Sequence, residues 1–249
     1  MKQDDSWNMD ENDVEWWNSY TRLFVQGIYS KNPKKRMAGL YFRPISMEAT
    51  SFYKSCDFNL LLMNTKVQMS LLDEFCKTYN QAGRRPCQLF FKVEARLLSH
   101  MSGQLIALMD NMHSQNIELT LDLNLPRHIS NDKEWQRSLF KIADGGHMVC
   151  LGGYNWKDNE SNSFHMVNEL FKYVRLGPPP SNLAEVNHFI DTCFYIKEKM
   201  SAQLILDRIQ SQTDLDIVCR TPFFALMGDY ISTAYLAKSM EDISYKVML

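Results

Sequence analysis

The sequence lacks the cysteine patterns of zinc sites and of disulfide-linked secreted domains. Its six cysteines are scattered through hydrophobic segments, with no Cys-x-x-Cys pair and no cluster of cysteine and histidine at zinc spacing. We therefore expect reduced thiols in the core rather than metal ligands. These residues are Cys56, Cys76, Cys87, Cys150, Cys193 and Cys219.

The sequence also lacks a long apolar run, a signal peptide and a large net charge. No apolar run approaches the ~20 residues that span a bilayer, and the acidic start MKQDDSWNMDENDVEWW has no basic region followed by an apolar one. The formal net charge of −2 provides no general attraction to nucleic acid or to an anionic membrane. These absences favour a cytoplasmic protein that binds neither nucleic acid nor membranes directly.

No internal repeat, low-complexity tract or linker divides the 249 residues. Hydrophobic residues make up 45% of the chain, which is enough for a complete core. We expect one domain over residues 13–243, preceded by an acidic tail at 1–12 and followed by a short tail at 244–249.

Strand-like and helix-like segments alternate along this domain. A capping-box pattern at Asn12 and Glu15, followed by apolar residues at helical spacing, predicts a first helix over 13–29 that packs through Trp17 and Phe24. The alternation favours an α/β fold of the (β/α) barrel class over an open sheet. Strands are expected at 40–45, 56–64, 88–98, 117–124, 147–153, 173–177, 203–209 and 224–231, and further helices at 67–83, 102–116, 134–146, 163–173, 183–200, 213–220 and from 236 onward.

Barrels of this class carry their functional groups at the carboxyl ends of the strands, and few such groups occur here. A divalent cation needs several converging carboxylates, whereas Asp207 alone has a clear position for one and Lys92 would repel a cation. We therefore expect no metal, no cofactor and no catalytic residue. The candidate positions are Asn59, Lys92 or Glu94, Thr120 or Asp122, Gly152, Gly153, Arg175, Gly177, Asp207, Gln210 and Met227.

Two features of these strand ends have alternative interpretations. The pair Gly152 and Gly153 can supply a positive φ, can let a ligand approach the backbone closely, or can mark side chains that have been lost. The cations Lys92 and Arg175 are expected to pair with Glu94, Asp122 or Asp207 in a polar barrel mouth. The functional alternative is that both cations bind an anion without a metal.

Taken in order, the strand segments resemble those of the EAL domain, the barrel with which bacteria hydrolyse cyclic di-GMP. LYFRPI (40–45) is similar to the family's LYYQPI, and FNLLLMN (58–64) stands where EALLRW gives the domain its name. The resemblance covers about residues 13–243 and implies a single EAL-type modified barrel. Further matching segments are FFKVEARLL (90–98), IELTLDL (117–123), GHMVCLGGYN (146–155), KYVRLG (172–177), LILDRIQS (204–211) and MG (227–228).

The same resemblance implies that the catalytic and metal-binding residues of the family are missing. Gly152 and Gly153 stand where active members have a metal-binding Asp-Asp pair, and Arg175 stands where they have the catalytic lysine. The domain is therefore expected to be degenerate and non-catalytic. At the remaining altered positions, Asn59 replaces a glutamate of the family, Lys92 an asparagine and Thr120 a glutamate. Gly177 replaces an aspartate, Asp207 and Gln210 each replace a glutamate, and Met227 replaces a glutamine.

The stretches LGG…ELFKYVRLG and IQSQTDLDIVCRTPFFALMG resemble a degenerate branch of the family, the enterobacterial EAL-like antagonists of the flagellar master regulator FlhDC. This resemblance implies a protein that binds the FlhD subunit and keeps the activator off DNA, and so represses motility. The alternative is an inactive receptor for cyclic di-GMP or another anion. The sequence does not identify the partner-binding residues.

Overall fold

The computed structural model describes residues 21–32, 34–44, 88–94, 98–124, 133–157 and 168–236. Asn59, the strand predicted at 56–64, the helices predicted at 67–83 and beyond 236, and both predicted tails lie outside these residues. The expectations for those segments therefore stay predictions.

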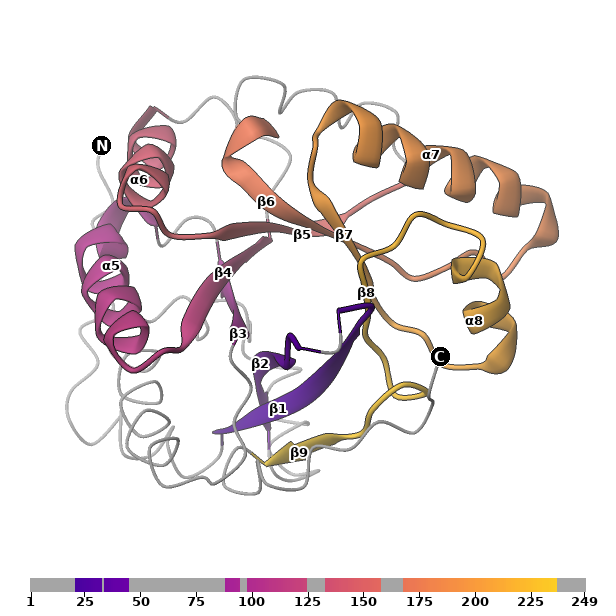
Figure 1. The fold of residues 1–249 in the computed structure, drawn as a ribbon, viewed down its shortest axis with the longest axis horizontal. Helices are drawn as coiled ribbons and strands as arrows, with labels where there is room; N and C mark the ends of the chain where they lie inside the picture. Colours follow the sequence, from indigo (N-terminus) through magenta and orange to yellow (C-terminus); the bar gives the residue numbers. More distant parts are fainter. Residues whose placement is uncertain are drawn as a thin grey trace, which may run out of the picture.

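Eight of the described strands form a closed ring. Seven strands pair in chain order, each parallel to the next, and β1 (Thr21–Ser30) closes the ring because it pairs antiparallel with both β2 and β8 (Figure 1). The short β9 (Ala234–Leu236) pairs with β1 beside β8. The predicted single-domain α/β barrel is thus confirmed. The seven strands are β2 (Met37–Pro44), β3 (Gln88–Glu94), β4 (Glu118–Asn124), β5 (Val149–Tyr154), β6 (Phe171–Leu176), β7 (Gln203–Leu206) and β8 (Ala225–Leu226).

The first helix predicted over 13–29 is wrong for residues 21–29, which belong to β1. Phe24 and Ile28 are four residues apart, and this separation places two side chains on one face of a strand as well as on one face of a helix. Ile28 points into the barrel interior, and Phe24 stacks on Tyr41 of β2 with ring centroids 6.4 Å apart. The apolar spacing alone could therefore not distinguish the two structures. Trp17 lies outside the described residues.

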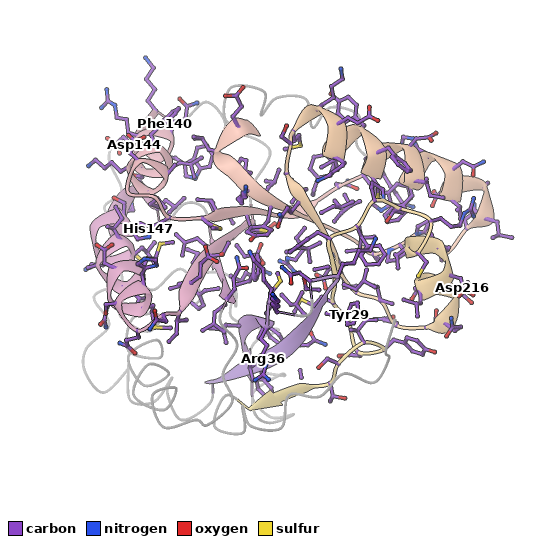
Figure 2. The ribbon with its side chains drawn as sticks, viewed as in Figure 1. Tyr29, Arg36, Phe140, Asp144, His147 and Asp216 are labelled. Atoms are coloured by element: carbon purple, nitrogen blue, oxygen red, sulfur yellow. The ribbon has the colours of Figure 1, made fainter. Side chains whose placement is uncertain are left out.

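Helices cover the outside of the ring. Figure 1 shows α5 (Leu98–Ser114) and α6 (Lys133–Asp144) together on one side, with α7 (Val186–Lys199) and α8 (Gln212–Val218) on the other. On α6, Trp135 and Leu139 are buried, whereas Phe140 and Asp144 point away from the strands (Figure 2). Helix α8 begins at a capping box in which Ser211 and Asp214 bond each other's backbone. No helix in the described part of the chain is long and apolar enough to cross a membrane.

Two apolar cores explain why most strands are buried on both faces. The larger core lies between the ring and the helices, and it includes Trp135 of α6 and Phe189 of α7. The smaller core fills the interior of the barrel (Figure 2). The interior core is formed by Ile28, Met37, Phe90, Cys150, Tyr173, Ile205, Ala225 and Met227.

Three further expectations need correction. The helix predicted over 163–173 is wrong for residues 168–173, which form a short 3₁₀ turn (Asn168–Leu170) and the start of β6 at Phe171, where Phe171 and Tyr173 are buried; residues 163–167 lie outside the described residues. The strand predicted over 224–231 is limited to Ala225–Leu226, since a turn at Gly228 comes directly afterwards. Cys150 and Cys193 are buried free thiols as expected, but Cys219 is exposed because it lies just past the end of α8.

Candidate functional site at the barrel mouth

The carboxyl ends of the parallel strands meet at one rim of the ring, called the mouth. It is lined by Lys92, Asp122, Asn124, Gly152, Arg175 and Asp207. Arg175 of β6 lies between two carboxylates from different strands. Its Nη2 is 2.7 Å from Oδ2 of Asp122 on β4, and its Nη1 is 2.5 Å from Oδ2 of Asp207, which lies just after β7. The expected pairing of Arg175 within a polar mouth is confirmed.

Burial makes this triad a strong electrostatic feature. The side chains of Arg175 and Asp207 are each 15% exposed, and that of Asp122 is 6% exposed. Burial raises the pKa of Asp122, while the positive charge of Arg175 opposes this rise. The two carboxylates in turn raise the pKa of Arg175, although its own burial acts in the opposite direction. The guanidinium therefore stays charged, and it attracts both carboxylates, whose charges would otherwise repel each other.

Gly152 leaves room for the carboxylate of Asp122. A Cβ on Gly152 would overlap Oδ1 of Asp122 and would lie 3.1 Å from its Cγ and 3.2 Å from the carbonyl oxygen of Leu123. The missing side chain at 152 is therefore matched by a neighbouring side chain that fills the space. Gly153 has a φ of +65°, and a Cβ there would lie 2.7 Å from Oδ1 of Asn124. The glycine pair thus supplies a positive φ at the strand exit and space for side chains of β4.

The loop after β7 is held tightly against the neighbouring strand ends. A Cβ on Gly177 would overlap the carbonyl oxygen of Asp207, and a Cβ on Gly228 would overlap the backbone of Ile209. Arg208 donates from Nη2 to the carbonyl oxygen of Gly177 at 3.1 Å. Gly177 therefore belongs to the mouth as predicted, but it serves close backbone packing.

The other predicted site residues lie at different places in the barrel and do not form one site. Thr120 lies deeper in the barrel, where its hydroxyl accepts a hydrogen bond of 3.0 Å from Gln88, so Asp122 rather than Thr120 reaches the mouth. Met227 is buried in the interior core and acts as core filler. Gln210 is exposed after β7, and its backbone N–H donates to Asp214 of α8. Lys92 is exposed at the mouth, and its charge acts to lower the pKa of Asp122.

Sequence reasoning missed a polar network on the β1 side of the barrel. Gln26 of β1 is buried, and its Nε2 donates to Oδ1 of Asp229 at 3.0 Å and to the carbonyl oxygen of Ser232 at 2.8 Å. The hydroxyl of Tyr41 donates to Oε1 of Gln26 at 3.3 Å. These groups join β1 and β2 to the segment after β8, which lies about 200 residues away in sequence. The sequence signal that could have indicated this network is Gln26, a polar residue within a mostly apolar segment.

Solved structures with a similar fold share this arrangement of strands and helices. The Bacillus subtilis YkuI protein, with an EAL domain, superposes with a TM-score of 0.67 and 13% identity over 92% of this chain, and this chain covers 58% of YkuI. The FimX EAL domain from Pseudomonas aeruginosa superposes with a TM-score of 0.66 and 12% identity, over 92% of this chain and 95% of the FimX domain. An EAL domain protein from Listeria monocytogenes EGD-e superposes with a TM-score of 0.64 and 13% identity, over 94% of this chain and 97% of the Listeria chain. This chain has the fold of an EAL domain.

The likeness to EAL domains is one of fold, because no protein-family model and no curated protein sequence matches the chain. The YkuI structure is a complex with cyclic di-GMP and calcium, so the mouth can be tested for a similar cation. In the described part of the chain, no three His, Cys, Asp or Glu side chains converge in a group that could hold a metal ion. Asp122 and Asp207 both face Arg175, and Gly152 offers no ligand. These residues do not fit a divalent cation.

Proposed function

We propose that this chain is a non-enzymatic regulator in which an EAL-type barrel serves as a rigid scaffold for binding another protein. The observation that carries the non-enzymatic part is the ion-paired triad at the mouth. Arg175 engages Oδ2 of both Asp122 and Asp207, so a cation or a water nucleophile would have to displace the guanidinium to use the two acids together. A binding module needs only a stable fold and a surface, and the barrel retains both.

The proposed partner is a DNA-binding activator in the cytoplasm, with the FlhD subunit of FlhDC as the candidate. The support is the resemblance of two stretches, around Gly152 to Gly177 and around Gln210 to Gly228, to the EAL-like antagonists of FlhDC. The net charge of −2 favours action on the activator protein over competition for DNA. Binding would keep the activator off its promoters and so reduce flagellar gene expression and motility.

The described surface offers apolar groups for such an interface. Leu183 is 83% exposed, and Phe194 and Tyr195 of α7 are 44% and 42% exposed. Stable heteromeric interfaces bury about 800 Å² on each partner and centre on a few aromatic or long apolar side chains. These residues are therefore the first to replace when the interface is mapped, with the exposed polar Asn187 of α7 as a control position.

Size-exclusion chromatography of the purified chain with FlhD tests the partner directly. We expect co-elution at micromolar concentrations, loss of promoter binding by FlhDC in a gel-shift assay, and reduced swimming of a host that overexpresses the chain. Absence of co-elution together with unchanged motility would reject FlhD as the partner.

Turnover of cyclic di-GMP tests the non-enzymatic part separately. We expect no hydrolysis with magnesium or manganese above a contaminant control, and the Gly152→Asp variant should remain inert because the new carboxylate would have to displace Asp122. Measurable hydrolysis by the unmodified protein would show that the mouth is catalytic and would leave the partner question open to its own test.

The second candidate function is a receptor that binds cyclic di-GMP or another anion without hydrolysing it. The FimX EAL domain structure contains bound cyclic di-GMP, and Lys92 is an exposed cation at the mouth of this chain. Calorimetric titration with cyclic di-GMP, with and without magnesium, separates this candidate from the first. Micromolar binding that is weakened in Lys92→Gln, combined with no FlhD complex, would place the receptor first.

A further inference from the structure

Two carboxylates that come from different strands share one cation at the mouth. Asp122 reaches Arg175 from β4 and Asp207 reaches it from the end of β7, with distances of 2.7 and 2.5 Å. The same guanidinium contacts both Oδ2 atoms, so the two acids lie on either side of a single positive group. Without that group, two like charges would face each other in a site that is largely shielded from water.

The site also retains unused ligand capacity. Among the residues that the structure describes, Oδ1 of Asp122 has no hydrogen-bond partner, and the side chain is only 6% exposed. This oxygen occupies the space that a side chain on Gly152 would need. Nε of Arg175 is likewise buried without a partner. The guanidinium therefore offsets one of the two carboxylate charges and leaves one buried oxygen of Asp122 unused.

We propose that Arg175 is a built-in counter-ion that occupies the place between Asp122 and Asp207 where a hard divalent cation would otherwise bind. Carboxylate oxygens are the ligands that Ca²⁺ and Mn²⁺ accept, and the unpartnered Oδ1 of Asp122 adds a third oxygen to the two that now face the guanidinium. Replacing Arg175 by a neutral side chain converts the mouth into a divalent-cation site, whose affinity the nearby exposed Lys92 keeps weak. This inference is independent of the protein partner, since a chain that does not bind FlhD can still gain a cation site in this way.

Thermal unfolding of the full chain in metal-free buffer provides the test, with 10 mM CaCl₂ or MnCl₂ against NaCl of equal ionic strength. Wild type should show no cation-specific change in Tm. Arg175→Met should gain stability from either cation. If the new site has a Kd of about 1 mM, typical of weak calcium sites, a tenfold excess corresponds to a rise of roughly 3–6 °C for a domain of this size.

Two matched variants show whether the gain belongs to the carboxylate pair. Arg208→Met removes the neighbouring cation, whose side chain bonds only the carbonyl oxygen of Gly177 in the described structure, and it should behave as wild type. Arg175→Met combined with Asp207→Asn removes one carboxylate and should lose most of the cation-specific gain. A gain of equal size in Arg208→Met, or one that survives Asp207→Asn, would overturn the proposal.

A folding defect in Arg175→Met is also informative. Its refolding yield, and that of Arg175→Gln, should rise several-fold when calcium is present, whereas the yield of wild type should not change. If neither variant gains Tm or refolding yield from calcium or manganese, or if wild type gains as much as they do, Arg175 does not hold the place of a cation.

Discussion

The substitution Gly152→Ala tests whether the missing side chain at 152 is essential to the mouth. A Cβ at this position would fall well inside the 3.0 Å below which real Cβ contacts are essentially never seen, against Oδ1 of Asp122. The Asp122 carboxylate cannot retreat freely, because it is buried and its other oxygen is 2.7 Å from Arg175. The carbonyl oxygen of Leu123, 3.2 Å from the new methyl, limits movement of the backbone.

The expected cost depends on the two ways in which the site can respond. Overpacking costs about 1–3 kcal/mol when the surroundings shift, and breaking a buried ion pair costs about 3–5 kcal/mol. We therefore expect Gly152→Ala to lower the free energy of unfolding by roughly 2–4 kcal/mol, measured by urea denaturation. Gly103→Ala is the matched control, because a Cβ at that helical position meets no atom of the described residues within 4 Å. This change should stabilise the protein by about 0.5–1 kcal/mol.

A double-mutant cycle identifies Asp122 as the cause. In the background of Asp122→Ala, the Gly152→Ala change should cost less than about 1 kcal/mol, because the nearest remaining approach is then the 3.2 Å to the carbonyl oxygen of Leu123. A cost that is the same in both backgrounds would show that the carboxylate does not fill the space above Gly152. Wild-type stability of Gly152→Ala would refute the packing argument altogether.

Three further predictions concern packing and titration elsewhere in the fold. Gly228→Ala should lower the free energy of unfolding by about 2–4 kcal/mol in urea, because the new Cβ would overlap the backbone of Ile209 and the residue has a φ of +148°. Iodoacetamide treatment and mass spectrometry should show labelling of Cys219 in the native protein, while Cys150 and Cys193 should react only after unfolding; early labelling of either would contradict their burial. Burial raises the pKa of Cys193 to about 12, so the unfolded thiol ionises first and the free energy of unfolding should fall as the pH rises from about 9 towards 12. This contribution amounts to at most about 1.4 kcal/mol per pH unit, and an equally steep fall in Cys193→Ala would exclude it.

The barrel could be predicted from the sequence because most of its strands are buried on both faces and alternate with amphipathic helices. The strand β1 could not, because Phe24 and Ile28 fit both a helical and an extended period. Its antiparallel pairing with β2 and β8 depends on contacts between distant segments, such as Tyr29 with Leu226. No local pattern encodes that choice.

The sequence indicated which residues lie near the mouth, but only some of the contacts between them could be predicted. The pairing of Arg175 with acids from other strands could be predicted by placing all strand ends at one rim. The choice between Thr120 and Asp122 could not, since both lie on the same face of β4 and differ only in depth. The use of Gly152 as space for Asp122 requires the register between β4 and β5, in which Asn124 pairs with Gly152.

The reversed direction of β1 determines on which side of the ring the described part of the chain begins and ends. Thr21 pairs with Pro44 at the end of β2, and Leu236 of β9 pairs with Phe24, so the first described strand starts on the same side of the ring as the mouth and the last one ends there. Any segment joined to either point is tethered within a few residues of the mouth. Short tethers raise the local concentration of what they carry to the millimolar range. A peptide joined directly to Thr21 or to Leu236 would therefore be presented to the mouth as an intramolecular ligand, so binding assays should compare fusions at these two points with the unfused chain.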